Sequence, residues 1–501
     1  MWILDELFKL KNSDKLAINH GNDNITFKDL WNKSEILANY IKNNTEDNST
    51  VAIYGNKESE MLLTAVSSLK AGRSYSPIDI TFPENRVSKI MNRLNGNLIF
   101  NFSKNKLNNN YVEINKDDLN NILKENPKAT ISQDSWIKDD DIAYILFTSG
   151  STGEPKGVPI SKRNIETFNH WFKEYCEFGN GDYYVLDQAP YSFDLSVIAV
   201  HLYFSLGATL VAIDKEMLKD FNYLFDTLKN SNLNVWISTP SMMELCLFDE
   251  KFSSDLLPNL KKIIFIGEVL TKNLVRQLNT RFKDVEIING YGPTEATCGV
   301  SACYIKDEDL LAEDSLPIGY PGENIGFYIE KDGKIIDDDN TDGELICTGD
   351  SVSQGYYKNP ELTKEKFFTT EDNKMAYRTG DIVYKKGNLY YFKERKDFQV
   401  KLHGYRIELD DITNNIRNID YIDNSITIPV YKDDKVTHLT SFVVLNNKTD
   451  LQGLKLNIDI KNKLKKSIPS YMIPKKIIAV DKFPLNINGK IDRKKLLEDF
   501  S

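Results

Sequence analysis

Cysteine and histidine are both scarce, with five of each among the 501 residues of this chain. The cysteines, at positions 176, 246, 298, 303 and 347, form no Cys-x-x-Cys pair and show no other spacing typical of a metal site. The histidines are scattered, and no His-Glu-x-x-His motif occurs. From this cysteine usage we expect a cytoplasmic protein with reduced thiols.

Long uncharged runs are also rare. Residues 195–213 include no Lys, Arg, Asp or Glu, and this length approaches that of a membrane span. Ser196, His201 and Gly207 interrupt the run, so we interpret it as a buried helix, a turn at Gly207 and a strand over residues 208–213. The first residues lack the basic region and apolar core of a signal peptide. We therefore predict no membrane insertion.

Neither sign of charge dominates the chain. It has 63 basic and 73 acidic residues, interspersed, for a net charge of −10. This balance gives no reason to propose a nucleic acid partner. A chain of 501 residues is long for a single core, so we expect more than one domain.

The most informative stretch follows an apolar run at residues 144–147, which predicts a buried strand. Small residues come next, and their glycines let successive backbone N–H groups converge on one anion. The stretch contains Thr148, Ser149, Gly150, Ser151, Thr152, Gly153, Pro155 and Lys156. It predicts a phosphate-binding loop, although the order Pro-Lys-Gly at its end differs from a Walker loop. A flexible linker is the alternative, but a linker rarely follows a buried strand directly.

A second loop follows the strand predicted at residues 285–288, where open α/β sheets bind ligands. It consists of Asn289, Gly290, Tyr291, Gly292, Pro293, Thr294 and Glu295. Tyr291 offers a flat face for a purine, and Glu295 offers an oxygen ligand for Mg²⁺. Further on, Asp381 lies after a glycine, where its carboxylate can accept both hydroxyls of a ribose. The alternative for each motif is an ordinary structural turn.

These motifs, with matches from about residue 26 to residue 495, resemble the adenylate-forming superfamily, which includes amino-acid adenylation domains, acyl-CoA synthetases and luciferases. Within it the chain is most similar to the D-alanine–carrier protein ligases of teichoic-acid D-alanylation. The resemblance implies ATP and Mg²⁺ as cofactors, with Glu295 as the metal ligand. It assigns ATP binding to residues 148–153, Lys156, 289–294, Asp381, Arg395 and Lys490, and catalysis to Lys490, Thr294 and Arg395.

The resemblance also assigns a substrate pocket. Its residues are Phe193, Asp194, Leu195, Ile266, Gly290, Cys298 and Lys490. Asp194 would anchor the α-ammonium group of an amino acid, and the alternative for it is a helix N-cap. Ile266 stands where the D-alanine ligases carry Cys, so we expect it to narrow the pocket. D-Alanine remains the first expectation, with L-alanine and glycine less excluded than in relatives.

One junction departs from the family pattern. The family has Gly-Arg-x-Asp, whereas this chain has Glu394-Arg395-Lys396-Asp397. Arg395 and Asp397 are retained, so the nucleotide contact and the hinge at Asp397 carry over, and only the local backbone path is in doubt. Residues 399–408 match the loop that lines the channel for thioester formation, and Gly404 there allows close backbone approach.

We therefore predict an α/β protein with a large N-terminal domain of doubly wound sheets, residues 1–394, that includes a β-barrel-like subdomain over about 317–394. A small mobile α+β lid, residues 395–501, would follow. The expected function is activation of a small amino acid by ATP and transfer to a phosphopantetheine thiol on a carrier protein in trans, carried out by a monomer. The alternatives are another small amino acid for a nonribosomal pathway, an acyl-CoA synthetase, and a nucleotide-binding scaffold without catalysis.

Overall fold

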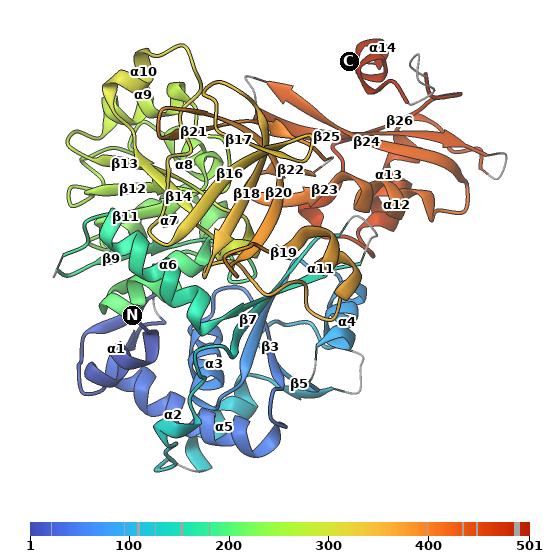
Figure 1. Ribbon diagram of the computed structural model, residues 1–501. Helices are drawn as coiled ribbons and strands as arrows, with labels where there is room; N and C mark the ends of the chain where they lie inside the picture. Colours follow the sequence, from blue (N-terminus) through green and yellow to red (C-terminus); the bar gives the residue numbers. More distant parts are fainter. Residues whose placement is uncertain are drawn as a thin grey trace. The chain divides into compact units, whose positions relative to one another are not determined.

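The computed structural model describes residues 1–21, 23–94, 96–107, 111–125, 127–150, 154–179, 181–397, 399–432, 435–446, 449–484 and 491–500. The chain forms two compact units. The first unit consists of Met1–Ile80, Met91–Phe147 and Gly157–Lys396, and the second consists of Thr81–Ile90, Thr148–Lys156 and Asp397–Ser501. The first unit contains most of the chain and its three large sheets (Figure 1).

The largest sheet has nine strands in the order β15-β14-β13-β12-β11-β9-β10-β1-β2. The strands from β13 to β1 pair in parallel, and the edge strands pair antiparallel. The bounds are Leu16–Asn19 (β1), Ile25–Thr26 (β2), Tyr184–Asp187 (β9), Thr209–Ala212 (β10), Val235–Ser238 (β11), Lys262–Phe265 (β12), Glu286–Tyr291 (β13), Ser301–Tyr304 (β14) and Tyr320–Pro321 (β15). The strands predicted at residues 208–213 and 285–288 are confirmed as β10 and β13, because their apolar runs are buried as parallel strands require.

A second, mostly parallel sheet has six strands in the order β6-β5-β3-β4-β7-β8. The bounds are Thr50–Gly55 (β3), Ser74–Asp79 (β4), Leu98–Asn101 (β5), Val112–Ile114 (β6), Ile142–Thr148 (β7) and Lys156–Ser161 (β8). β7 contains the apolar run predicted as a buried strand, and it leads directly into the small-residue loop. Two sheets with central parallel strands confirm the predicted α/β fold class.

Helices connect these strands. Those of the first unit are Ile3–Lys9 (α1), Phe27–Asn44 (α2), Ser59–Lys70 (α3), Lys116–Glu125 (α5), Lys162–Tyr175 (α6), Phe221–Lys229 (α7), Pro240–Leu247 (α8), Lys272–Arg281 (α9), Asp307–Leu311 (α10) and Pro360–Lys366 (α11). Thr26 caps α2, because its hydroxyl accepts a hydrogen bond from the Asp29 N–H at 3.1 Å. Ser161 and Asn164 form a capping box that fixes the start of α6 just after β8.

The uncharged run at residues 195–213 is buried within the first unit. It forms a π-helix at Ile198–Tyr203, a short 3₁₀ turn at Phe204–Leu206 and β10, and Gly207 has a φ of 70° between them. The expected order of helix, turn at Gly207 and strand is confirmed, with π rather than α geometry in the helix. Across the described parts of the chain, no helix combines the length and the apolar character that crossing a membrane requires.

The third sheet of the first unit is antiparallel, as predicted from its short strands. Its order is β17-β16-β18-β20-β19, and β21 pairs with β20. The bounds are Ile325–Lys331 (β16), Lys334–Ile336 (β17), Gly343–Gly349 (β18), Phe367–Thr369 (β19), Met375–Lys386 (β20) and Leu389–Arg395 (β21). Asp381 on β20 lies directly opposite Arg395 on β21 in this register.

The second unit has two small sheets. β22 and β23 form a hairpin, and β24, β25 and β26 form a three-stranded sheet. The bounds are Gln399–Leu402 (β22), Tyr405–Glu408 (β23), Ile422–Lys432 (β24), Lys435–Leu445 (β25), Lys476–Ala479 (β26), Leu409–Arg417 (α12), Gly453–Leu464 (α13) and Arg493–Phe500 (α14); α4, at Glu84–Arg93, belongs to both units. Leu456, Ile460 and Leu464 of α13 are buried in one core with the hairpin and α12.

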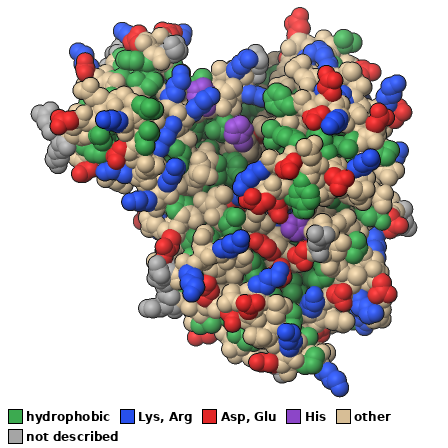
Figure 2. Space-filling model, turned by 180° about the vertical axis from the view of Figure 1, so that it is seen from behind, with side chains coloured by type: hydrophobic (Ala, Val, Ile, Leu, Met, Phe, Trp, Pro, Cys, Tyr) green, Lys and Arg blue, Asp and Glu red, His purple; other side chains and the backbone are tan. Residues whose placement is uncertain are grey.

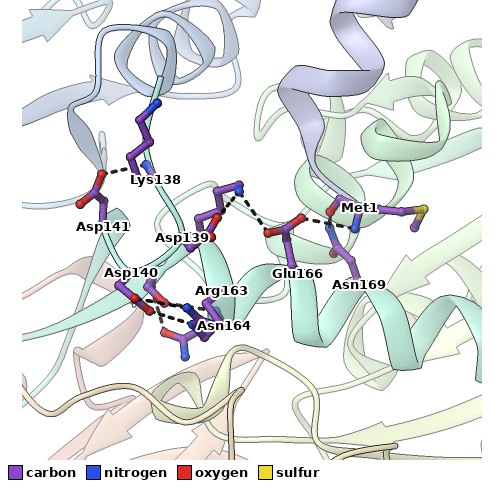
Figure 3. A network of polar contacts seen from close by, with 11 residues as sticks. Met1, Lys138, Asp139, Asp140, Asp141, Arg163, Asn164, Glu166 and Asn169 are labelled. Carbon is purple, nitrogen blue, oxygen red and sulfur yellow. Dashed lines mark hydrogen bonds and ion pairs between the residues drawn. The ribbon is translucent and has the colours of Figure 1, made fainter. Parts of the chain in front are cut away.

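A polar network joins the segment before β7 to the start of α6 after β8, at the strand ends away from the small-residue loop (Figure 3). Before β7, the Lys138 N–H donates to the Asp141 carboxylate at 2.7 Å. At the start of α6, Arg163 Nε lies 2.7 Å from Asp140 Oδ1, and the Arg163 N–H donates to the Asp139 carbonyl at 2.7 Å. The segments before β7 and after β8 are thereby joined.

Elsewhere on the surface, acidic and basic side chains are interspersed (Figure 2), as the sequence predicts.

Candidate active site

The candidate site of the first unit lies at the carboxyl ends of β12 and β13. The two strands pair in parallel with Phe265 opposite Asn289, so Ile266 and Gly290 follow side by side. The loop after β13 carries Thr294 and Glu295 in a short 3₁₀ turn that begins after Pro293. Carboxyl ends of parallel strands are where sheets of this type bind ligands.

Asp381, the predicted ribose ligand, has both carboxylate oxygens engaged. The Tyr291 hydroxyl donates to Oδ2, and Arg395 Nη1 donates to Oδ1 at 2.6 Å. Burial, and then the Asp381 charge, raise the pKa of Tyr291 well above its usual value, so the phenol stays protonated. Three residues that the sequence analysis assigned to nucleotide binding are thus brought together from β13, β20 and β21.

Asn289 is a fourth predicted nucleotide residue, and its side chain turns toward the protein. Its amide donates to the Pro317 carbonyl at 2.7 Å. Gly292 lies where a Cβ would come within 2.3 Å of the Cys298 carbonyl oxygen, so only glycine fits there. These contacts fix the path of the loop over residues 289–294.

Asp194, the predicted anchor for an α-ammonium, accepts a hydrogen bond from the Thr294 hydroxyl. Its own backbone carbonyl accepts from the Val197 N–H at 2.9 Å, at the turn where Phe193 and Leu195 lie and which leads into the π-helix. The carboxylate therefore bonds a residue of the predicted nucleotide loop. The candidate substrate residue Asp194 and the candidate nucleotide residue Thr294 are therefore in direct contact.

Tyr144 belongs to the same region, and the sequence analysis treated it only as part of a strand. Burial first, and then the neighbouring Tyr75, Cys298 and Asp194, raise its pKa well above the usual value. Its hydroxyl is buried and has no hydrogen-bond partner among the described residues. No local signal distinguishes Tyr144 from any other aromatic residue of a buried strand, so the sequence alone could not single it out.

Glu295, the predicted metal ligand, is fully buried. Its Oε1 accepts from the Tyr356 hydroxyl at 2.8 Å, and Tyr356 is another residue that the sequence analysis did not single out. No cluster of three or more metal-ligating side chains occurs in the part of the chain that the structure describes. One carboxylate nevertheless suits Mg²⁺, which is commonly held by one or two carboxylates together with nucleotide phosphates.

Ile266 packs against a glycine. A Cβ at Gly290 would lie 2.6 Å from Cγ1 and 2.7 Å from Cδ1 of Ile266, and one at Gly299 would lie 3.7 Å from Cδ1. Contacts near 2.6 Å are not tolerated, so the isoleucine occupies the space that a side chain at position 290 would need. Cys298, the last predicted pocket residue, is buried beside Gly299 with a φ of 67°.

The structure describes Thr148, Ser149, Gly150 and residues 154–156 of the phosphate loop. All of them belong to the second unit. A Cβ at Gly150 would lie 2.2 Å from the Glu154 carbonyl oxygen, so the loop requires glycine there. The Thr148 hydroxyl is buried without a hydrogen-bond partner among the described residues. An unpartnered buried donor beside a required glycine fits a loop that receives an anionic oxygen.

Other groups of this loop bond the β22–β23 hairpin within the second unit. Lys156 Nζ lies 3.0 Å from Glu408 Oε1, and Gln399 Nε2 donates to the same oxygen at 2.7 Å. The Ser149 hydroxyl donates to the Arg406 carbonyl at 3.1 Å and accepts from the Glu408 N–H at 3.2 Å. The predicted phosphate ligands Ser149 and Lys156 are therefore held by protein groups.

The remaining predicted residues have different outcomes. The Asp397 carboxylate, at the predicted hinge, accepts from the Gln399 N–H at 3.2 Å. Ser151, Thr152, Gly153 and Lys490 lie outside the described residues, so their assignments remain predictions.

A doubly wound α/β core with candidate nucleotide-binding loops at its strand ends is typical of a class of nucleotide-dependent enzymes. The chain belongs to the family of AMP-binding enzymes: the model of that family matches residues 8–357, and the model of the AMP-binding enzyme C-terminal domain matches residues 413–490. It is an AMP-forming ligase of the adenylate-forming superfamily, as the motifs predicted.

Among curated proteins, the chain is 37% identical to a D-alanine–D-alanyl carrier protein ligase of Bacillus cereus (strain AH187) over 503 residues, which covers 100% of this chain and 99% of that protein. A protein of the same name from Bacillus cereus (strain G9842) is 38% identical over 498 residues, covering 99% and 98%. The predicted similarity to D-alanine–carrier protein ligases is thereby confirmed along the whole chain.

Solved structures agree in fold. PA1221, a nonribosomal peptide synthetase protein with adenylation and PCP domains, has a TM-score of 0.84 at 23% identity, covering 99% of this chain and 84% of that one. The Vibrio cholerae adenylation domain AlmE, in complex with glycyl-adenosine-5′-phosphate, has a TM-score of 0.82 at 22% identity, covering 99% and 97%. Both confirm the predicted fold class.

Proposed function

We propose that this protein joins a small amino acid, D-alanine before others, to AMP and then transfers the aminoacyl group to the phosphopantetheine thiol of a separate carrier protein. The observation that carries the proposal is the contact between Asp194 and Thr294. A carboxylate suits an α-ammonium group, and a neighbouring hydroxyl suits the phosphate that the substrate carboxylate attacks. The name of the curated relatives supports the same substrate and the same acceptor.

The first step needs no protein nucleophile. A carboxylate oxygen of the amino acid attacks the α-phosphorus of ATP, and the bond to pyrophosphate breaks. Asp194 would hold the ammonium group, Thr294 would donate to the α-phosphate, and Lys490 would neutralise the charge that builds there. Mg²⁺, held by Glu295 and the phosphates, would balance the charge of the triphosphate.

We assign ribose and adenine binding to residues of the first unit. Asp381, positioned by Arg395 and Tyr291, would exchange the tyrosine hydrogen bond for bonds from the ribose hydroxyls. The adenine would lie along the loop over residues 289–293. On the second unit, Thr148 would donate to a phosphate oxygen, together with the loop over residues 149–153 and Lys156.

In the second step the carrier's thiol attacks the carbonyl carbon of the aminoacyl-adenylate, and AMP leaves. The hairpin around Gly404 would line the path of the thiol, and rotation about Asp397 would exchange Lys490 for this hairpin. We assign the reaction to the cytoplasm, where ATP is available, and expect a monomer to carry it out.

A second small amino acid is the main competing substrate. The resemblance places Ile266 where D-alanine ligases carry Cys, and this larger, β-branched side chain packs closely against Gly290. Glycine or L-alanine would therefore be accepted more readily than in relatives.

ATP–pyrophosphate exchange with D-alanine, L-alanine, glycine and propionate tests this function. We expect exchange with the three amino acids, highest with D-alanine, and none above background with propionate. Equal exchange with propionate would contradict the role of Asp194 and favour an acyl-CoA synthetase.

A further inference from the structure

Lysine is concentrated in one segment of the second unit. Residues 453–476 contain seven lysines and a single acidic residue, Asp459, in a chain whose net charge is −10. This segment comprises α13, the short turn after it and the first residue of β26. Its local charge is therefore opposite in sign to that of the whole protein.

One stripe along α13 carries both apolar residues and lysines; Lys461 in it is half-buried, and the exposed Lys455 and Asn462 lie off it. Leu454, Ile458, Lys461 and Lys465 follow one another at spacings of four, three and four, which places them within about 60° of the helix circumference. The Leu454 side chain is 76% exposed and that of Ile458 is 50% exposed, whereas Leu456 and Ile460 are in the core. The helix thus presents two apolar residues and two lysines on one outer face.

Two more lysines extend this stripe onto the neighbouring strand. Lys461 Nζ donates to the Lys475 carbonyl at 2.7 Å, and the Asn457 amide donates to the Ile477 carbonyl at 3.1 Å. Lys475 and Lys476, at the start of β26, therefore lie beside α13. We call Leu454, Ile458, Lys461, Lys465, Lys475 and Lys476 the lysine face.

The charges of the lysine face are not balanced within the described residues. Lys463, outside the face, lies 3.7 Å from Asp420 and 3.8 Å from Asp459, but no described carboxylate pairs with the four lysines of the face. Burial and the neighbouring Lys465 lower the pKa of Lys461, and burial with Lys475 and Lys476 lowers that of His438. Like charges held together without counter-ions destabilise the free protein, and an anionic partner would remove that cost.

A tyrosine connects the segment after α13 to the hairpin that is proposed to line the thiol path. Tyr471, six residues after Lys465, stacks on Tyr405 with ring centroids 3.8 Å apart and planes 17° apart. Tyr405 follows Gly404 at the tip of the β22–β23 hairpin. The lysine face and this tip thus belong to one unit, and Tyr471 links the chain segment between Lys465 and Lys475 to the tip.

We propose that the lysine face is the docking surface for the carrier protein, which would bind through an acidic face with apolar residues over Leu454 and Ile458. The proposal rests on the proposed function, because only a carrier needs to be held while its thiol reaches the hairpin. The charge argues for an acidic partner, and the phosphodiester that links phosphopantetheine to its carrier adds a negative group on the same side. Apolar residues amid the lysines favour a protein over a free polyanion.

The test compares two acceptors. Lys465→Glu/Lys476→Glu changes two exposed lysines of the face, and Lys124→Glu/Lys128→Glu makes the same charge change on exposed lysines of the first unit. For each protein, kcat/KM for aminoacyl transfer is measured with the holo-carrier and with free pantetheine, which has the thiol but no protein to dock. We expect the face variant to lose about tenfold or more with the carrier and to stay within about twofold with pantetheine.

The control variant should match the unmodified protein with both acceptors. Raising the salt concentration should reduce transfer to the carrier in the unmodified protein and have little effect on the face variant, because the steering charges are gone. A second variant, Leu454→Gln/Ile458→Gln, should weaken transfer to the carrier at every salt concentration.

Three outcomes would overturn the inference. Unchanged kcat/KM for the carrier in the face variant would show that docking lies elsewhere. An equal loss with pantetheine would mean that the substitutions damage the hairpin. Binding of the unmodified protein to anionic phosphatidylglycerol vesicles, lost in the face variant while carrier kinetics stay the same, would assign the lysines to a lipid surface. Failure of the proposed function is distinct, because the unmodified protein would then load neither acceptor.

Discussion

The two units differ in how the polar groups of their candidate nucleotide residues are engaged. In the first unit, Asp381, Tyr291 and Arg395 form a closed set of hydrogen bonds from three strands. In the second unit, Lys156 and Ser149 of the phosphate loop bond the hairpin residues Glu408 and Arg406. In the proposed function, ribose binding replaces the Tyr291 hydrogen bond to Asp381, and phosphate binding replaces the contact of Lys156 with Glu408. The two units therefore differ in the group that a ligand would displace, which is a neutral phenol in the first unit and a carboxylate in the second.

The largest effect should come from Lys490→Ala, which removes the charge assigned to the phosphate at the moment of reaction. We expect the activation free energy of pyrophosphate exchange to rise by about 3–4 kcal/mol, which slows exchange. ATP binding should be largely retained through the first-unit contacts. Exchange kinetics and nucleotide titration measure the two effects separately. Lys494→Ala, an exposed neighbour, is the control, and near-normal exchange in Lys490→Ala would end this assignment.

Asp194→Ala should have the next largest effect, on selectivity. A carboxylate paired with an ammonium contributes about 1.5–3 kcal/mol, so the ratio of kcat/KM for D-alanine over propionate should fall by at least about tenfold. Exchange with each acid over a range of concentrations measures the ratio. If the variant still discriminates as the unmodified protein does, Asp194 serves only the local turn.

A substitution that disturbs the packing of Ile266 against Gly290 should lower the free energy of unfolding. Gly290→Ala places a methyl group where Ile266 already lies, which should cost about 1–3 kcal/mol of unfolding free energy. Because cysteine is smaller, Ile266→Cys should recover most of that loss when the two changes are combined. Thermal unfolding of the single and double variants measures the coupling, and strictly additive effects would show that the two residues do not share one space.

The same Ile266→Cys variant tests selectivity between the two hands of alanine. We expect the ratio of kcat/KM for D-alanine over L-alanine to rise by up to about 10- to 200-fold, which corresponds to about 1–3 kcal/mol of activation free energy. The reason is that residue 266 then matches the family pattern. Exchange assays with both enantiomers provide the ratio. An unchanged ratio would mean that position 266 has no influence on chirality in this chain.

The smallest expected effect concerns the contacts of the phosphate loop. Glu408→Gln removes the charge that competes with a triphosphate for Lys156, so KM for ATP in the exchange reaction should fall about two- to fivefold. Transfer to the carrier should not improve in parallel. The exposed Glu394→Gln is the matched control, and a higher KM for ATP in Glu408→Gln would contradict competition for Lys156.

Much of the fold followed from sequence patterns. Apolar runs predicted the buried strands at β7 and β10 because parallel strands covered on both faces carry few polar residues. The cap at Thr26 was predictable because its hydrogen bond is local. By contrast, the π geometry of residues 198–203 depends on packing around the whole segment, which a local pattern does not encode.

The candidate site divides in the same way. Motifs predicted Tyr291, Asp381 and Arg395 individually, and the β20–β21 register that joins the last two appears only in the folded structure. Tyr144 and Tyr356 approach Asp194 and Glu295 from distant parts of the chain, so no motif marks them. The packing of Ile266 on Gly290 likewise depends on the pairing of β12 with β13, although each residue was already a candidate.

Intact-mass spectrometry of the carrier protein tests the central claim most directly. The purified protein, holo-carrier, ATP, Mg²⁺ and an equimolar mixture of D-alanine, L-alanine, glycine and propionate are combined, and the carrier is weighed after a short reaction. The account predicts a carrier loaded mainly with a single alanyl group by a thioester that hydroxylamine removes, and almost no loading by Lys490→Ala. A carrier that remains unmodified while the same protein forms acyl-adenylates, or one loaded with propionyl as readily as with alanyl, would contradict it.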